Sequence, residues 1–397
     1  MLDDTPSGWK SVQLGDVCEI ARGGSPRPIE KFITDDPDGI NWIKIGDASA
    51  SSKYIYATKE KIRPEGASKS RFVNEGDFLL SNSMSFGRPY ILKTNGCIHD
   101  GWLVLSDRSG EFTTEFFYYL LSSPTVFQQF SDNAAGSAVK NLNKAIVGKV
   151  RVYLPPLAEQ ERIAEILTSV DDSIRATEAV IAQAERVKQC LADEIVLGLA
   201  EEKPISRVKL SEVADVNPRT RLEKGRTYQF VEMANLPVRS PNIERAENKV
   251  FTSGGAKFIN GDTLFARITP CTENGKLGYV DFLSDGEVAF GSTEFTVLRC
   301  RDHEILPKLL YYFCYSNPVR SYAIQKMIGS TGRQRVPNHV FDEIEVPIYE
   351  AETQTNFLSL LESLDDQIKT NRQTLGQLQR LKRGLMDDFL TGRVRTV

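Results

Sequence analysis

Val170-Asp171-Asp172-Ser173-Ile174 recurs later in the chain as Leu364-Asp365-Asp366-Gln367-Ile368. Because Asp171 corresponds to Asp365, the two copies are offset by 365 − 171 = 194 residues. The same offset joins further identical pairs beyond the motif: Arg186 and Arg380, Lys188 and Lys382, Leu191 and Leu385, Asp193 and Asp387, Gly198 and Gly392. The sequence therefore predicts an internal duplication.

Apolar residues around the motif alternate in steps of four and three, which is the seam of a coiled coil. They are Ile163, Leu167, Val170, Ile174, Ile181 and Ala184 in the first copy, and Phe357, Leu361, Leu364, Ile368, Leu375 and Leu378 in the second. A stutter then continues the seam at Val187, Leu191 and Ile195, and at Leu381, Leu385 and Phe389. We expect two helices, near 157–199 and 350–391, each of about 40 residues and about 60 Å.

These two helices can pair in parallel or antiparallel. Antiparallel pairing places the two globular parts at opposite ends, related by a pseudo-twofold axis, whereas parallel pairing would crowd both at one end. We favour the antiparallel pair because the connecting domain is compact and can begin where the first helix ends. The seam residues expected to be buried are Leu167, Ile174, Leu361 and Ile368.

Each long helix follows a globular part, and the two globular parts share weaker repeats. A glycine-aspartate turn leads into an aliphatic strand at Gly76-Asp77 and again at Gly261-Asp262. The predicted fold is mixed α/β, of the α+β kind, with two globular domains separated by two long helices that form an antiparallel coiled coil. The predicted divisions are 1–156 and 203–349 for the globular domains, and 157–202 and 350–397 for the helices.

Composition indicates an ordinary globular protein, with 41% hydrophobic and 26% charged residues. The acidic start Met1-Leu2-Asp3-Asp4 does not resemble a secretory signal, and no apolar stretch is long enough to span a membrane. Six cysteines without C-x-x-C spacing are typical of reduced thiols. We therefore expect a cytoplasmic protein.

The net charge of −4 is unevenly distributed. Counting Lys and Arg against Asp and Glu gives 0 for residues 1–156, −7 for 157–202, +3 for 203–349 and 0 for 350–397. The acidic excess therefore lies on the first helix, and the globular parts are neutral to mildly basic. Such a balance permits a local DNA-facing patch but not strong binding by the chain alone.

Catalytic motifs are missing from the sequence. It has no G-x-x-x-x-G-K-[ST] phosphate loop, no Asn-Pro-Pro-aromatic or Asp-Pro-Pro-aromatic tetrad, and no glycine-rich S-adenosylmethionine loop. His99, His303 and His339 lack metal-binding spacing. The aspartate pairs at 171–172 and 365–366 flank the seam, so we interpret them as solvated or partner-binding faces rather than metal ligands. The sequence predicts a non-enzyme without a metal site.

Clusters of Arg, Lys, Asn, Ser and Thr occupy turns in both globular parts. Arginine can pair bidentately with guanine and asparagine with adenine, while Ser, Thr and Lys suit phosphates. A single cluster is more typical of a solvated loop, and both interpretations stay open at this point. Asn82 and Arg267 follow the same kind of turn and strand, so we expect them at equivalent places. The candidate DNA-contacting residues are Ser81, Asn82, Arg88, Lys140, Asn141, Lys144, Arg267, Thr269, Asn274, Lys276, Arg333, Arg335 and Asn338.

The whole chain resembles the specificity subunit of type I restriction-modification systems. The most specific stretches are residues 10–17 (KSVQLGDV), 154–163 (LPPLAEQERI), 167–174 (LTSVDDSI) and 384–392 (GLMDDFLTG). The second copy of the proline-rich stretch is degenerate, because residues 347–354 (PIYEAETQ) keep one proline and the glutamine but lose the double proline.

This resemblance implies two target recognition domains, each reading one half of a split site in double-stranded DNA. The helices would set the gap between the half-sites and dock two modification subunits, which bind S-adenosylmethionine and methylate adenine; no cofactor is expected in this chain. Restriction subunits, which translocate and cleave DNA, would join them. The alternative is a duplicated coiled-coil scaffold or adaptor that does not read DNA. A methyltransferase or nuclease is a further alternative, against which the missing motifs argue.

Overall fold

The computed structural model describes residues 5–49, 52–82, 86–134, 141–244, 246–301 and 304–396. The chain divides into two compact units. Unit 1 comprises Met1–Arg175 and Gly376–Val397, and unit 2 comprises Ala176–Leu375. Among the described residues, no helix combines the length and apolar character that crossing a membrane requires.

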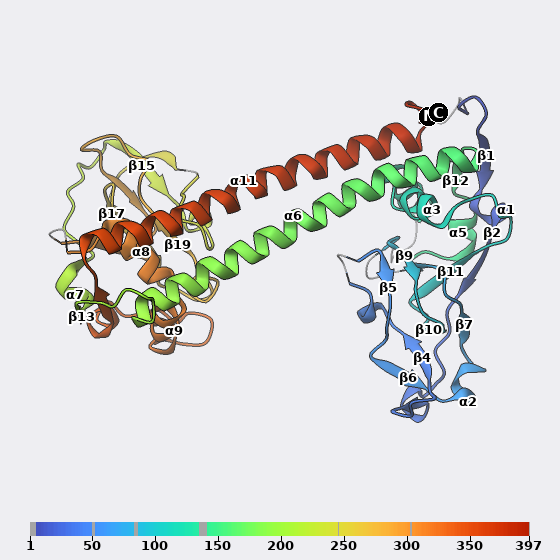
Figure 1. Cartoon of the computed structure of the whole chain (residues 1–397), viewed down its shortest axis with the longest axis horizontal. Helices are drawn as coiled ribbons and strands as arrows, with labels where there is room; N and C mark the ends of the chain where they lie inside the picture. Colours follow the sequence, from blue (N-terminus) through green and yellow to red (C-terminus); the bar gives the residue numbers. More distant parts are fainter. Residues whose placement is uncertain are drawn as a thin grey trace. The chain divides into compact units, whose positions relative to one another are not determined.

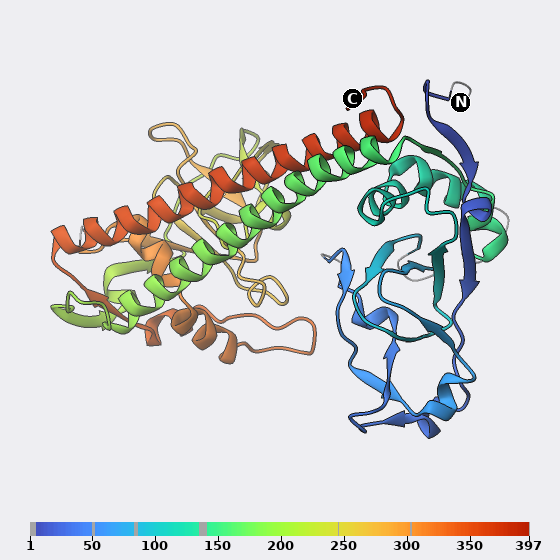
Figure 2. The same cartoon turned by 45° about the vertical axis from the view of Figure 1, so that its right-hand side comes forward.

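Two long helices, α6 (Leu157–Leu197) and α11 (Ala351–Leu390), contribute to both units and lie side by side (Figures 1 and 2). In unit 1, Asp171 of α6 pairs with Lys382 of α11. In unit 2, Glu185 pairs with Arg372, and Lys188, further along α6, pairs with Asp365, which comes earlier in α11. In unit 1, Glu159 likewise pairs with Arg395, beyond the end of α11. The helices are therefore antiparallel in each unit, and this prediction is confirmed.

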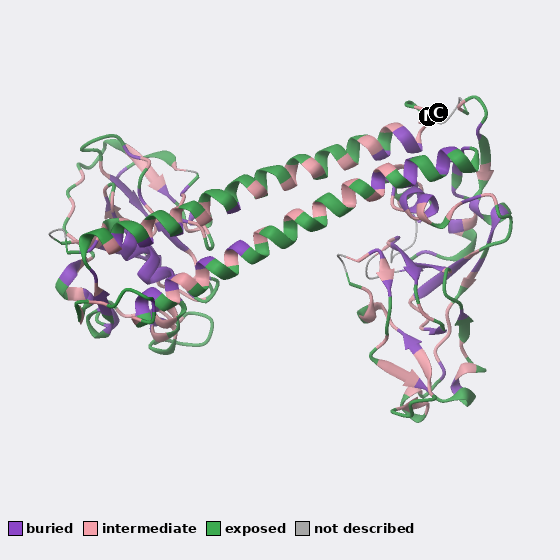
Figure 3. Cartoon of the chain, in the orientation of Figure 1, coloured by how far each residue is buried: buried purple, intermediate pink, exposed green. Residues whose placement is uncertain are grey.

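The seam is buried at three of the four expected positions. Leu167, Leu361 and Ile368 are buried, but Ile174 is only half-buried, so that prediction was wrong. Figure 3 shows exposed residues along much of both helices and buried ones where they meet the globular parts. Leu167 and Leu361 each belong to the core of a globular part, whereas Ile174 belongs to neither of those cores.

The continuation of the seam at Val187 and Leu381 was also wrong. Val187 is 42% exposed and Leu381 is 50% exposed. From Ala184 the buried face of α6 advances in steps of four to Lys188 and Ala192. Val187 therefore points outward, because a lysine occupies the buried position that the apolar pattern assigned to valine.

The described residues in the globular part of unit 1 form three sheets. Strands β1 (Lys10–Gln13) and β12 (Arg151–Leu154) form the first. The second has the order β3 (Ile33–Thr34), β6 (Glu60–Ile62), β4 (Ile40–Ile43), β10 (Gly96–Ile98), β7 (Arg71–Val73). The third has the order β2 (Cys18–Arg22), β11 (Trp102–Asp107), β8 (Phe78–Ser81), β9 (Pro89–Leu92), β5 (Tyr54–Ile55). The helices are α1 (Leu14–Val17), α2 (Pro64–Ala67), α3 (Thr114–Leu121), α4 (Pro124–Asn133) and α5 (Lys144–Gly148), with 3-10 turns η1 (Ile29–Lys31) and η2 (Ile45–Asp47).

The globular part of unit 2 repeats this plan. Strands β13 (Ser206–Lys209) and β22 (Glu345–Ile348) form one sheet. The others have the orders β14 (Ala214–Val216), β21 (Phe295–Cys300), β18 (Thr263–Ala266), β19 (Leu277–Tyr279), and β16 (Glu247–Val250), β15 (Thr227–Val231), β20 (Ala289–Gly291), β17 (Ala256–Phe258). The helices are α7 (Leu210–Val213), α8 (Pro307–Tyr315), α9 (Asn317–Gln325) and α10 (Val340–Glu343), with the 3-10 turn η3 (Met233–Asn235).

Strand register confirms that Asn82 and Arg267 occupy equivalent places. Ser81 at the end of β8 faces Trp102, and Ala266 at the end of β18 faces Phe295. The sheets that contain β4 and β15 match as well, because β4 runs parallel to β10 and β15 runs parallel to β20. Each unit therefore carries the same mixed fold, so surfaces built on matching strands can be compared directly.

A buried glutamine ties each long helix to its globular part. Gln160 in α6 accepts a hydrogen bond from the backbone N–H of Thr113 and donates to the carbonyl of Glu111. Gln354 in α11 makes the same pair of bonds to the backbone of Leu306 and Glu304. This shared task explains why the degenerate second copy of the proline-rich stretch keeps its glutamine.

Candidate nucleic-acid interface

Unit 2 has a groove of about 1060 Å³ on the sheet of β16, β15, β20 and β17. The loop between β14 and β15 forms one wall, and strands β15, β16 and β17 together with residues 286–288 before β20 contribute the rest. We call it the basic groove; it is lined by Arg219, Thr220, Arg221, Leu222, Glu223, Arg226, Thr227, Tyr228, Gln229, Asn248, Lys257, Gly286, Glu287 and Val288. Guanidinium, ammonium, amide and hydroxyl groups thus converge on one concave surface beside the carboxylates of Glu223 and Glu287. The cationic and hydrogen-bonding groups suit phosphates and base edges.

The arginine-bearing loop is held at both ends. Asn217 begins it in a left-handed conformation, with φ of 53°, which asparagine tolerates better than most residues. The side-chain oxygen of Asn217 accepts the N–H of Val297 at 3.0 Å. At the far end, the backbone N–H of Gly225 donates to the carbonyl oxygen of Phe251, and the backbone N–H of Phe251 donates to the carbonyl oxygen of Arg226. The intervening arginines therefore project from a defined loop.

Arg219 and Arg221 are exposed on this loop, whereas Arg226 pairs with Glu223. Across the groove, the ammonium of Lys257 lies 5.4 Å from the ring centroid of Phe251. This contact limits the freedom of the lysine side chain. The two exposed arginines are therefore the side chains best placed to meet a polyanion. Sequence reasoning missed them, although Arg219-Thr220-Arg221 directly follows a strand and an asparagine-proline turn, a signal that could have been used.

Arg267 adjoins the basic groove. It lines a neighbouring cavity of about 380 Å³ together with Arg219, Thr220 and Lys257, which line both hollows. Its Nη1 donates to the side-chain oxygen of Asn338 at 3.2 Å, while its buried Nε has no hydrogen-bond partner. The structure thus brings one predicted pair, Arg267 and Asn338, together beside the arginine loop.

Other predicted residues of unit 2 are occupied within the protein. The Nζ of Lys276 donates to the carbonyl oxygen of Met233 at 2.6 Å, and the hydroxyl of Thr269 donates to the carboxylate of Glu273. Arg335 is held by Glu294 in a two-pronged ion pair. Asn274 and Arg333 are exposed. Asn274 and Arg333 are therefore accessible, as the predicted contact with DNA requires.

In unit 1 the first predicted cluster is at odds with the structure. Ser81 and Asn82 are 0% and 2% exposed. The hydroxyl of Ser81 is bonded to the backbone of Arg88, and the amide of Asn82 donates to the carbonyl of Asp100 at 2.8 Å. Their burial leaves no polar surface for DNA, so we drop both from the candidate interface. A β-strand end was mistaken for an exposed turn.

The remaining predicted residues of unit 1 differ in accessibility. Arg88 is half-buried, with its guanidinium 5.5 Å from the ring centroid of Tyr90. Asn141, just before α5, and Lys144, at the start of α5, are both exposed. Lys140 lies outside the described residues.

Unit 1 has its own groove on the matching elements. It measures about 870 Å³ and is formed by the loop after β2, by strands β3, β4 and β6, and by residues 99–100 after β10. Strands β2, β4 and β6 correspond to β14, β15 and β16 of unit 2. We call it the apolar groove; it is lined by Ser25, Pro26, Arg27, Pro28, Ile29, Glu30, Ile33, Trp42, Lys44, Glu60, His99 and Asp100. Equivalent strands therefore frame a cationic surface in one unit and a largely apolar one in the other.

The polar end of the apolar groove centres on Asp100. Its carboxylate accepts a hydrogen bond from Ser25 at 3.0 Å and lies 2.9 Å from Nε2 of His99. Burial alone would raise the pKa of Asp100, but this hydrogen bond and the charges of His99 and Arg22 outweigh it and hold the pKa below its usual value. The groove thus presents an anionic acceptor beside apolar walls, which differs chemically from the arginine loop of unit 2.

The interpretation of the aspartate pairs also needs correction. Asp171 bonds to Tyr119 and Lys382, and Asp365 bonds to Tyr312 and Lys188. These first aspartates are therefore internal bridges rather than solvated faces, because each meets a tyrosine from its globular part. Asp172 and Asp366 are exposed, as expected.

Comparison with known proteins gives consistent matches. The model of the type I restriction modification DNA specificity domain matches the chain twice, at residues 6–186 and 202–380. The type I restriction enzyme MjaVIII specificity subunit of Methanocaldococcus jannaschii is 21% identical over 424 residues, which is 98% of this chain and 94% of that protein. The EcoAI specificity subunit of Escherichia coli is 30% identical over 206 residues, which is 47% of this chain and 35% of that protein.

Two solved structures share the fold. A chain from a type I R-M system, solved to explain complex assembly and conformational transition, has a TM-score of 0.62 at 18% identity and covers 98% of this chain and 100% of its own. The S subunit of a type I restriction-modification system from M. genitalium has a TM-score of 0.57 at 13% identity, covering 98% and 97%.

The duplicated fold and the two family matches define a protein with two DNA specificity domains. The chain belongs to the type I restriction modification DNA specificity family. Its role is that of a specificity subunit of a type I restriction-modification system, with one specificity domain in each half of the chain.

Proposed function

We propose that the basic groove of unit 2 and the apolar groove of unit 1 each read one half of a bipartite site in double-stranded DNA. The observation that carries this proposal is that equivalent strands frame two concave surfaces with unlike side chains. A duplicated fold with identical surfaces would read the same bases twice. Unlike surfaces on one scaffold are what recognition of two different half-sites requires.

In unit 2 we assign Arg219 and Arg221 to DNA contact, with Arg267 and its partner Asn338 beside them. The exposed Arg333 is a further candidate for contact. An exposed arginine can pair with guanine or with a phosphate, and the two roles differ in their response to sequence and salt. In unit 1, exposed Asn141 and Lys144 lie outside the apolar groove and suit phosphate contact. Neither globular part has a large positive charge, so partner subunits that clamp the DNA would supply further affinity.

We further propose that the chain is non-catalytic and that its helices dock two modification subunits, which supply S-adenosylmethionine-dependent methylation, with restriction subunits added for cleavage. Val187 and Leu381 support two equivalent docking positions. They are related by the offset of 194 residues, and both are exposed apolar side chains. Two copies of one partner need two like surfaces, which an internal duplication provides.

The experiment is binding of duplex DNA by the chain assembled with its modification subunit. We expect Arg219→Ala or Arg221→Ala to cost about 1–3 kcal/mol on the specific duplex if the arginine reads guanine, with relaxed choice at one base pair. A phosphate contact would weaken binding to all sequences and lower the salt dependence by about one ion.

Arg301→Ala is the matched control, because Arg301 is an exposed arginine of unit 2 already paired with Asp215. It should leave binding unchanged. Equal binding of specific and scrambled duplex by the assembled wild-type complex would refute DNA reading and favour the duplicated scaffold instead. S-adenosylmethionine binding by the isolated chain would refute the non-catalytic assignment.

A further inference from the structure

One carboxylate in unit 2 joins three parts of the structure. Asp365 of α11 pairs with Lys188 of α6, with 2.6 Å between Oδ1 and Nζ. Its other oxygen, Oδ2, accepts a hydrogen bond of 2.6 Å from the hydroxyl of Tyr312 in α8. One oxygen is thus used by the opposite long helix and the other by the globular domain.

Lys188 is itself held by the globular domain. Its side chain is fully buried, its Nζ donates to the carbonyl of Arg239 at 2.9 Å, and it lies 4.6 Å from the ring centroid of Tyr315. Burial lowers the pKa of Lys188, and Asp365 opposes that shift. Because a buried ammonium is costly without partners, Lys188 is restricted to the place where Asp365 and the Arg239 carbonyl are both within reach.

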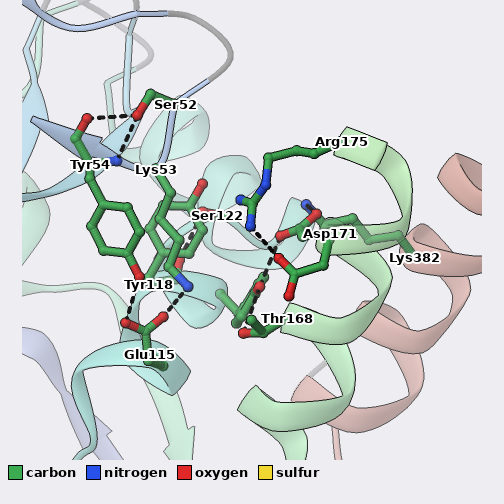
Figure 4. A network of polar contacts seen from close by, with 12 residues as sticks. Ser52, Lys53, Tyr54, Glu115, Tyr118, Ser122, Thr168, Asp171, Arg175 and Lys382 are labelled. Atoms are coloured by element: carbon green, nitrogen blue, oxygen red, sulfur yellow. Dashed lines mark hydrogen bonds and ion pairs between the residues drawn. The ribbon is translucent and has the colours of Figure 1, made fainter. Parts of the chain in front are cut away.

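Unit 1 repeats this junction with the roles of the two helices exchanged (Figure 4). Figure 4 labels Asp171 of α6 and Lys382 of α11, whose ion pair measures 2.6 Å. Asp171 also accepts a hydrogen bond of 2.8 Å from the hydroxyl of Tyr119 in α3. Thr168, one turn earlier, lies 3.2 Å from the same hydroxyl. The junctions are equivalent, because Asp171 and Asp365, like Lys188 and Lys382, are 194 residues apart.

Each junction restrains two things at once. The lysine–aspartate pair sets the register of α6 against α11, and the tyrosine–aspartate bond sets the globular domain against both. Sliding one helix by a single turn, about 5.4 Å, would separate the ammonium from its carboxylate. The neighbouring Asp172 carries the same charge, but its one ion pair in the described part of the chain is with Arg175 of its own helix, so it restrains neither.

We propose that Asp171 and Asp365 are positioning residues that hold each recognition domain at one place on the helix pair, and thereby set the spacing between half-sites that the complex accepts. The inference rests on the proposed function, since a spacing has meaning only if both domains read DNA. Neither carboxylate touches DNA; each acts through its tyrosine and its lysine.

The test is methylation, by the chain assembled with its modification subunit, of duplexes with constant half-sites and a spacer varied one base pair at a time. Tyr312→Phe, Asp365→Asn, Tyr119→Phe and Asp171→Asn should each reduce the preference for the best spacer by roughly tenfold, the size expected for losing a hydrogen bond to a charged group. Base choice within each half-site should stay the same. Asp172→Asn and Asp366→Asn are matched controls and should keep the wild-type preference.

Each tyrosine variant removes one hydroxyl and no charge. The tyrosine variants therefore still test the inference if an aspartate variant unfolds, and thermal unfolding shows which variants are folded. Wild-type spacer preference in both folded tyrosine variants would overturn the inference. Altered base choice with an unchanged spacer preference would overturn it too, because the residues would then act on reading rather than on positioning. Failure of the wild-type complex to methylate in a sequence-dependent way would instead refute the proposed function, so the two failures are distinguishable.

Discussion

Arg335 is chelated by Glu294, with 2.9 Å from Nε to Oε2 and 2.7 Å from Nη2 to Oε1. The hydrogen bonds from Arg335 hold the pKa of Glu294 below its ordinary value, so the carboxylate stays charged and keeps the guanidinium occupied. An arginine in a two-pronged ion pair has already used the donor geometry that recognises guanine. Arg335 is therefore a weaker candidate for base reading than the exposed arginines of the basic groove.

We predict that Arg335→Ala changes the affinity for specific and scrambled duplex by less than about twofold, the range of an ordinary surface change. Glu294→Gln should release the guanidinium and raise affinity for every duplex at low salt, because it adds an uncompensated cation. Binding titrations of both variants at two salt concentrations check this. A selective loss on the specific duplex for Arg335→Ala would show that the ion pair opens to read a base.

The helix seam gives a matched pair of leucines. Leu361 is fully buried in the core of unit 2, whereas Leu381 is 50% exposed. Leu361→Ala should lower the free energy of unfolding by about 2–5 kcal/mol, and Leu381→Ala by no more than about 0.5 kcal/mol. If Leu381 docks a modification subunit, its variant should nevertheless recover less of that subunit on co-purification. Denaturant unfolding and co-purification separate the two effects.

Exchange of residues 1–150 for the matching domain of a relative should change only one half of the methylated sequence. We expect this because the exchange leaves the fold, the core and the basic groove of unit 2 unchanged. Sequencing of methylated DNA after the exchange provides the measurement. A change in both halves, or in neither, would contradict independent reading by the two domains.

Glu159 predicts a pH dependence of stability. This buried carboxylate accepts hydrogen bonds from Arg395 and from the indole N–H of Trp9, and the bond from Arg395 is the main cause that holds its pKa below the ordinary value of 4.5. Its contribution is therefore present above about pH 4.5 and is lost as the pH falls through the lowered pKa. Thermal unfolding of wild type and Glu159→Gln should differ most at neutral pH and converge in acid. A difference that persists unchanged in acid would contradict this assignment.

Much of the fold could be predicted because its signals are local and occur twice. The alternation of apolar residues around Leu167 and Leu361 indicates a helix without knowledge of its partner, and the repeated register identifies that partner. The same pattern failed at Val187 and Leu381, where the globular parts add buried positions that a two-helix seam does not contain. Periodicity describes one element at a time, whereas burial depends on everything packed around it.

The sequence by itself determined the duplication and the two long helices, because both rest on spacing along the chain. It favoured antiparallel pairing and carried the motifs that resemble a specificity subunit, and the salt bridges between α6 and α11 established the antiparallel direction within each unit. Only the tertiary structure decided which polar side chains can meet DNA. The side-chain amide of Asn82 donates a hydrogen bond to the carbonyl of Asp100. The guanidinium of Arg335 is paired with the carboxylate of Glu294, 41 residues away in the chain. Arg219 stays exposed on its loop. Residue type states what a side chain could bind, but partners brought together by folding determine whether its donors are still available.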